Sequence, residues 1–200
     1  KQIRERTGYY AQMVPKVPTS YVRLMDGMHI KIGGKNAKYG WHCISGYGHA
    51  PEHIALHCPA LNLLISGDML LPRISTNVSV YDLEPEANSL ALFLSSLEKM
   101  KPLPAQTLIL PSHGKPFTGL HERIRQLEQH HAERLAEVMA ACKDKPQTAH
   151  DIVAIMFKRT LDLHQLTFAQ GEALAHLHML WHQGHLLRKT IGGVYHFQKA

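Results

Sequence analysis

The stretch 46-GYGHAPEHIALHCPALNLLISGDMLL-71 decides how the rest of the sequence is interpreted. Two apolar runs, HIALHC and LNLLIS, are joined by Pro59-Ala60, which predicts two antiparallel strands with a short turn between them. His49 follows the preceding apolar run WHCIS, and Asp68 follows the second run of the stretch. Imidazole and carboxylate groups are ligands that zinc and other first-row metals prefer. The stretch therefore suggests a metal site at the ends of strands.

The flanking sequence extends this pattern in both directions. Upstream, YVRLM, MHIKI and WHCIS are separated by Asp26-Gly27 and Gly33-Gly34, which predicts a meander of short antiparallel strands over residues 21–71. Downstream, apolar residues at helical spacing over 90–100 predict a helix, and TLILP predicts a buried strand that ends in 112-SHG-114. We expect an α/β architecture for this part of the chain.

His49, Asp68 and His113 each come directly after a predicted strand. Loops at strand ends converge on ligands in layered α/β proteins, so a shared location is plausible. The glycine beside each of the three would let the backbone turn sharply. Sixteen histidines occur in the chain and Gly-Asp is a common turn, so spacing alone leaves the metal site undecided.

Composition restricts the class of protein. The 200 residues are 44% apolar, which suits a folded core, and no apolar run approaches the roughly 20 residues of a membrane-spanning helix. Three cysteines without C-x-x-C spacing argue against a disulfide framework or a thiolate zinc cluster, and favour a cytoplasmic location. The whole net charge of +6 arises within residues 1–40, either as an ordinary solvated surface or as an attraction for an anionic partner.

The quoted stretch and LILPSHG together resemble the second half of the metallo-β-lactamase-fold hydrolases, over residues 21–118. The resemblance implies the C-terminal half of an αββα sandwich. It implies that His49 is a terminal ligand of one metal, that Asp68 bridges two metals, and that His113 is a terminal ligand of the other. His53 would support the ligands from behind.

The tail resembles a C-terminal winged-helix extension found in a subgroup of these hydrolases, the glyoxalase-II-like proteins and relatives of mitochondrial lactamase-like endoribonucleases. A charged helix is predicted over 120–142, then helices over 148–157 and 168–183 and a β-hairpin around Gly192-Gly193. We expect the C-terminal part of the metallo-β-lactamase-like domain over 1–118, a linking helix over 119–146 and a small winged-helix domain over 147–200.

One family motif is missing. The spacing H-x-H-x-D-H, which supplies further metal ligands in the family, is absent, since the only H-x-H is His176-Leu177-His178. The chain opens on Lys1, and we expect the motif to lie upstream of it. Two divalent ions, zinc or else iron or manganese, are expected in the intact parent protein. The fragment alone is expected to bind metal weakly or not at all and to have negligible turnover.

The resemblance implies metal-assisted hydrolysis, with an anionic acyl thioester or ester as the first choice of substrate. Arg73 and Asn77, in the loop after Asp68, and Tyr10, in the basic segment, are candidate substrate contacts. A phosphodiesterase or ribonuclease is the alternative enzyme, although FAQGEALAHLHMLWHQG carries no Lys or Arg and nucleic acid is not expected as a partner. The other alternative is a non-enzymatic module, in which the apolar sheet face is covered either by a second copy, which forms a homodimer, or by residues 1–20.

Overall fold

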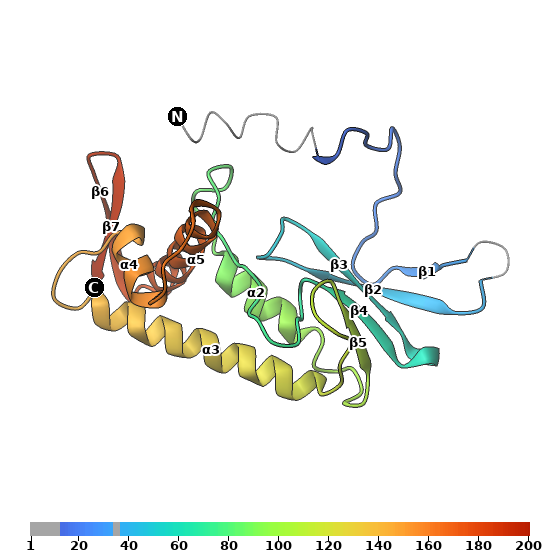
Figure 1. Cartoon of the computed structure of the whole chain (residues 1–200). Helices are drawn as coiled ribbons and strands as arrows, with labels where there is room; N and C mark the ends of the chain where they lie inside the picture. Colours follow the sequence, from blue (N-terminus) through green and yellow to red (C-terminus); the bar gives the residue numbers. More distant parts are fainter. Residues whose placement is uncertain (1–12, 34–36) are drawn as a thin grey trace.

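The computed structural model describes residues 13–33 and 37–200. Its main sheet has the order β1-β2-β3-β4-β5, and the first four strands are antiparallel neighbours while β5 runs parallel to β4 (Figure 1). The meander predicted over residues 21–71 is therefore confirmed between His29 and Gly67, as is the strand that ends before His113. The strands are β1 (His29–Lys31), β2 (Gly40–Gly46), β3 (His53–Cys58), β4 (Leu63–Gly67) and β5 (Leu108–Pro111).

The strand expected at residues 21–25 is wrong. This segment has no strand structure, and Tyr21 and Val22 are 86% and 83% exposed. Main-chain pairing with β2 begins only at the turn that follows, where Gly27 N–H donates to the Cys43 carbonyl. Apolar residues form a strand only where a neighbouring strand or layer buries them. The described residues provide no such neighbour for residues 21–25.

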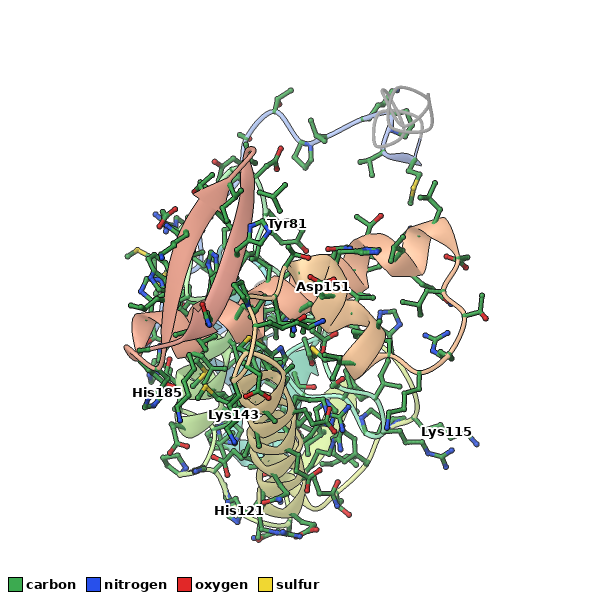
Figure 2. The ribbon with its side chains drawn as sticks, turned by 90° about the vertical axis from the view of Figure 1, so that its left-hand side faces the viewer. Tyr81, Lys115, His121, Lys143, Asp151 and His185 are labelled. Carbon is green, nitrogen blue, oxygen red and sulfur yellow. The ribbon has the colours of Figure 1, made fainter. Side chains whose placement is uncertain are left out.

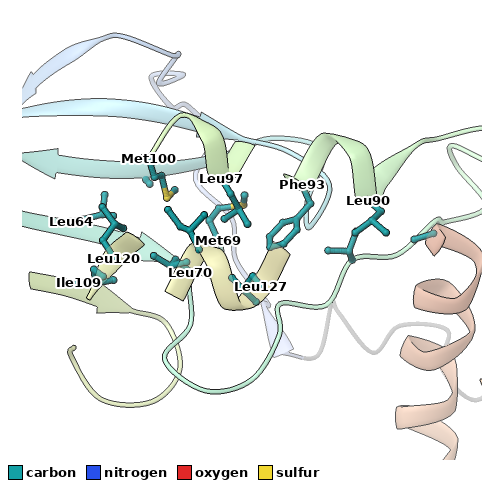
Figure 3. Close-up of a cluster of buried hydrophobic side chains, with 14 of the residues drawn as sticks. Leu64, Met69, Leu70, Leu90, Phe93, Leu97, Met100, Ile109, Leu120 and Leu127 are labelled. Carbon is teal, nitrogen blue, oxygen red and sulfur yellow. The ribbon is translucent and has the colours of Figure 1, made fainter. Parts of the chain in front are cut away.

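Helices α2 (Ser89–Glu98) and α3 (Leu120–Ala141) form a core with one face of the sheet. The register places Ile44 opposite Ala55, and Leu64 beside Ile109, on that face. Figure 3 shows these strands meeting the helices through fully buried side chains. Each buried leucine, isoleucine or phenylalanine contributes roughly 1.5–3 kcal/mol relative to exposure, so this layer fixes the strand ends. The large members are Leu64, Met69, Leu70, Leu90, Phe93, Leu97, Met100, Ile109, Leu120, Ile124 and Leu127.

The opposite face of the sheet is also apolar. Ile54, Leu56 and Ile65 alternate with the core residues of β3 and β4, and all three are only half-buried among the described residues. A sheet with two apolar faces is typical of a layered fold in which a second layer covers the open side.

The C-terminal part contains α4 (Ala149–Met156), α5 (Leu163–His182) and a hairpin of β6 (Leu186–Ile191) and β7 (Val194–Lys199). Helix α5 begins before the expected residue 168 because the Asp162 side chain accepts from Gln165 N–H and the Gln165 side chain accepts in return, which is a capping box. The predicted order of helix, helix and hairpin is confirmed. Its winged-helix classification and the three domain boundaries stay predictions.

The two parts are in contact through α5. This helix packs against α2, and a second core, with Phe197 and Ile152 at its centre, shares Leu135 and Leu174 with the first (Figure 1). None of the helices in the described part of the chain is long and apolar enough to cross a membrane.

Candidate metal centre

The three residues proposed as ligands come together at one edge of the sheet. His49 lies in the β2–β3 turn, Asp68 follows β4, and His113 follows β5. The His49 Nε2 lies 3.5 Å from Asp68 Oδ2, and the His113 Nε2 lies 3.5 Å from Asp68 Oδ1. The carboxylate thus stands between two imidazoles and presents a different oxygen to each.

The His49 ring is held by the backbone on its far side. Its Nδ1 lies 2.8 Å from the Asn77 carbonyl oxygen, which can only accept, so Nδ1 carries the proton. The lone pair of the neutral ring is then on Nε2, the nitrogen that faces Asp68. A histidine whose other nitrogen donates to a carbonyl is the usual arrangement of a metal ligand.

Glycines bring this turn close to its support. Gly48 has φ of +90°, and a Cβ there would meet the Ser89 carbonyl oxygen and would lie 2.7 Å from Phe93 N. Gly67, at φ +54°, lies against the His53 ring in the same way. Both positions combine a left-handed backbone with a close approach, so only glycine fits without displacing its neighbours.

The distances between these three side chains suit coordination of a divalent metal better than direct hydrogen bonds. At 3.5 Å the two imidazole–carboxylate contacts exceed the usual hydrogen-bond length. Two ligands about 2.1 Å from a tetrahedral zinc lie roughly 3.4 Å apart, which matches both separations. In the described ranges 13–33 and 37–200, no three His, Cys, Asp or Glu side chains converge on a single point. The geometry therefore suits an aspartate shared between two positions, each with one histidine.

His53 lies directly behind the ligands. Its Nδ1 is buried and has no hydrogen-bond partner among the described residues. Burial, and then the neighbouring His49, lower the pKa of His53, while Asp68 acts in the opposite direction. The ring is consequently neutral near pH 7 and lies against Gly67, while its role in supporting the ligands stays a prediction.

A basic groove adjoins His113. It measures about 650 Å³ and is lined by Pro72, Arg73, Ile74, His113, Gly114, Lys115, Pro116 and Phe117. Arg123 of α3 fixes its wall, because its Nε donates to the Leu71 carbonyl at 2.6 Å and its NH2 group to the Ile74 carbonyl at 2.8 Å. Arg73 was expected from sequence as a substrate contact, whereas Lys115 and Arg123 were not singled out.

The other two candidate substrate contacts are placed differently. Asn77 offers its carbonyl to His49, and its side-chain oxygen accepts from Ser79 Oγ at 3.2 Å. In the structure Asn77 positions the metal-ligand candidate His49. A contact between Asn77 and the substrate stays a prediction. Tyr10 lies outside the described residues.

Two family models match the sequence. The metallo-beta-lactamase superfamily model matches residues 40–113, which carry His49, Asp68 and His113, and the model for the metallo-beta-lactamase-like C-terminal domain matches residues 135–200. The chain belongs to the metallo-beta-lactamase superfamily. A solved superfamily structure, a beta-lactamase domain protein from Burkholderia ambifaria, is 54% identical with a TM-score of 0.92 and aligns to 99% of this chain and 57% of its own.

Less similar relatives also align to most of this chain and to about half of their own length. A metallo-beta-lactamase family protein from Thermus thermophilus is 30% identical, with a TM-score of 0.78 over 92% of this chain and 56% of that chain. The probable metallo-hydrolase YqjP of Bacillus subtilis is 27% identical over 146 residues, which are 70% of this chain and 44% of YqjP. The chain thus spans about half the length of the superfamily relatives it matches.

Proposed function

We propose that this chain supplies one side of a binuclear metal centre in a metal-dependent hydrolase. The main support for this proposal is the geometry at Asp68, where His49 and His113 each lie 3.5 Å from a different carboxylate oxygen. The similarity to a protein named a probable metallo-hydrolase supports the reaction class. Because H-x-H-x-D-H is absent from the 200 residues, we propose that the remaining ligands lie in another part of the full-length protein.

The proposed substrate is a thioester or ester with an anionic group. Bound divalent ions would polarise the carbonyl and supply hydroxide near neutral pH. In the overall reaction, the oxygen of water bonds to the carbonyl carbon, the bond from that carbon to sulfur or oxygen breaks, and the leaving group receives a proton. The chain's own contribution is to orient His49 through the Asn77 carbonyl and to offer Arg73 and Lys115 to a carboxylate or phosphate.

The test is hydrolysis by the zinc-loaded full-length protein of an anionic thioester, a neutral ester and single-stranded RNA. We expect Arg73→Ala to raise KM for the anionic thioester about tenfold, as loss of a charge-assisted contact does, with little change for the neutral ester. Arg125→Ala is the matched control, because Arg125 is exposed on α3 and pairs with Glu122. Cleavage of RNA without cleavage of either ester would contradict the proposal and favour the phosphodiesterase alternative.

A further inference from the structure

A second pocket is lined by His49 and shares no lining residue with the basic groove beside His113. Its volume is about 170 Å³, and it lies between the 47–51 turn, segment 79–87 and α2. Apolar side chains dominate its lining, and three of them are exposed: Leu83 at 90%, Tyr81 at 50% and Leu92 at 45%. Large apolar side chains gathered at one hollow mark a binding site more often than a random surface does.

The wall of this pocket is fixed by the C-terminal part of the chain. The Arg188 guanidinium stacks 3.7 Å from the centroid of the Trp181 ring and donates to Glu86 Oε2 at 2.7 Å. His178 donates to the Ala87 carbonyl at 3.0 Å and His182 to the Glu86 carbonyl at 2.9 Å. Three side chains from α5 and β6 thus hold Glu86 and Ala87 at the end of segment 79–87, and Trp181 holds one of the three in place.

The apolar pocket and the basic groove differ in charge. Glu84 lines the apolar pocket and its negative charge disfavours an anion there, whereas Arg73 and Lys115 line the groove beside His113. Figure 2 shows Tyr81, which lines the apolar pocket, and Lys115, which lines the basic groove, well apart on the molecule. A ligand that crosses the centre would therefore place an uncharged part near His49 and an anionic part near His113.

We infer that the pocket beside His49 receives the uncharged, apolar acyl group of the substrate, an assignment that rests on the proposed function. Apolar cavities of about 150 Å³ accommodate a benzene ring, so 170 Å³ accommodates an acyl chain of about six carbons. The leaving group, with its anionic carrier, then occupies the basic groove. The substrate class is an acyl thioester or ester with a short to medium apolar acyl chain.

Binding can be tested without metal by titrating this chain with straight-chain alcohols of increasing length and recording amide NMR shifts. We expect shifts at residues 47–51, 83–87 and 92, with affinity rising about fourfold per methylene until about six carbons. Leu92→Trp, which fills the pocket, should weaken hexanol binding at least tenfold. Leu187→Trp is the control, since Leu187 is 57% exposed on the hairpin and does not line the pocket. Shifts elsewhere, or unchanged binding by Leu92→Trp, would overturn the inference.

A kinetic measurement separates this inference from the proposed function. In the metal-loaded full-length protein, the ratio of kcat/KM for a hexanoyl over an acetyl thioester should exceed ten, and Leu92→Trp should reduce that ratio at least tenfold while Leu187→Trp keeps it. If no ester is hydrolysed but hexanol binds at the pocket, the hydrolase proposal fails and the apolar site stands. If esters are hydrolysed with no dependence on acyl length, the acyl pocket is wrong and the hydrolase proposal stands.

Discussion

His131 and His176 are buried against each other between α3 and α5, with Nδ1 of the first 3.2 Å from Nε2 of the second. Burial lowers the pKa of His131 to about 3 and that of His176 to about 4, and it raises the pKa of the nearby Glu172 to about 7. The native state therefore keeps two neutral imidazoles and a protonated carboxyl over much of the mildly acidic range.

The sign of the pH dependence follows from these directions. Between pH 6.5 and about 4 the unfolded histidines bind protons that the native ones do not, so acidification destabilises the fold. Glu172 acts oppositely between pH 7 and 4.5, because its native form holds the proton. The two histidines outweigh the one carboxyl by a net of about one proton, so for these three groups the free energy of unfolding should fall by about 1.4 kcal/mol per pH unit between pH 6 and 5. Lowered pKa values at other histidines add to this fall: His53, His57, His130 and His178.

We predict that Glu172→Gln steepens this dependence by about 1.4 kcal/mol per pH unit, because it removes the opposing group. Urea unfolding at several pH values from 5 to 6 measures the slope. Glu133→Gln is the control, since Glu133 is exposed on α3. A slope that is unchanged or shallower in Glu172→Gln would show that this carboxyl is ionised in the native state.

At the residue scale, the sequence could predict where His49, Asp68 and His113 lie because each follows an apolar run that is recognisable as a strand. It could not predict the Asn77 carbonyl as the partner of His49, since any residue has a carbonyl and only the path of the loop brings this one within 2.8 Å. Arg123 was missed for a related reason. Its two carbonyl partners are about 50 positions away in sequence, and nothing local marks such a contact.

Among the elements, α5 has the widest influence on the site. Gly171 lets this helix approach the segment that follows Asn77, since a Cβ there would lie 2.6 Å from Ser79 Cβ. The Val80 N–H donates to the Gly171 carbonyl at the same contact. A glycine inside a helix costs roughly 0.5–1 kcal/mol relative to alanine, so the close approach is the physical reason for its presence.

We predict that Gly171→Ala lowers the free energy of unfolding by up to about 2 kcal/mol, because overpacking of about 1–3 kcal/mol outweighs the gain in helix propensity. In a Ser79→Gly background the obstacle is gone, and the same substitution should raise stability by up to about 1 kcal/mol. Urea unfolding of the four proteins in this double-mutant cycle makes the comparison. The same sign in both backgrounds would show that Gly171 does not act through Ser79.

Sequence periodicity located β2 to β5 and helices α2 and α3 well, because each has a face that the core buries. It failed for residues 21–25, where apolar residues are present but burial is not. It also placed the start of α5 at residue 168, whereas the capping box begins the helix at Leu163. Helix ends depend on hydrogen bonds of single side chains, which periodicity does not register.

For the whole molecule, two features have the same explanation: one apolar face of the sheet is uncovered, and the metal centre has ligands on one side. Both are expected where a further layer of the fold supplies the cover and the remaining ligands. Ile54, Leu56 and Ile65 remain half-buried on the face away from the helices. Superfamily relatives of about twice this length have room for a covering layer and for further ligands. Coverage of this face by a second copy, and hence a homodimer of the 200-residue chain, stays a prediction.

The central claim is that Asp68 lies between two metal positions, with His49 on one and His113 on the other. The most direct test is titration of this chain with Co²⁺, followed by paramagnetic broadening of its NMR signals. Binding should be weak, and the imidazole signals of His49 and His113 should broaden before those of the chain's other histidines. Asp68→Asn should abolish the preference, while Asp82→Asn, at an exposed aspartate, should preserve it. Broadening that begins at other histidines, or that persists unchanged in Asp68→Asn, would contradict the account.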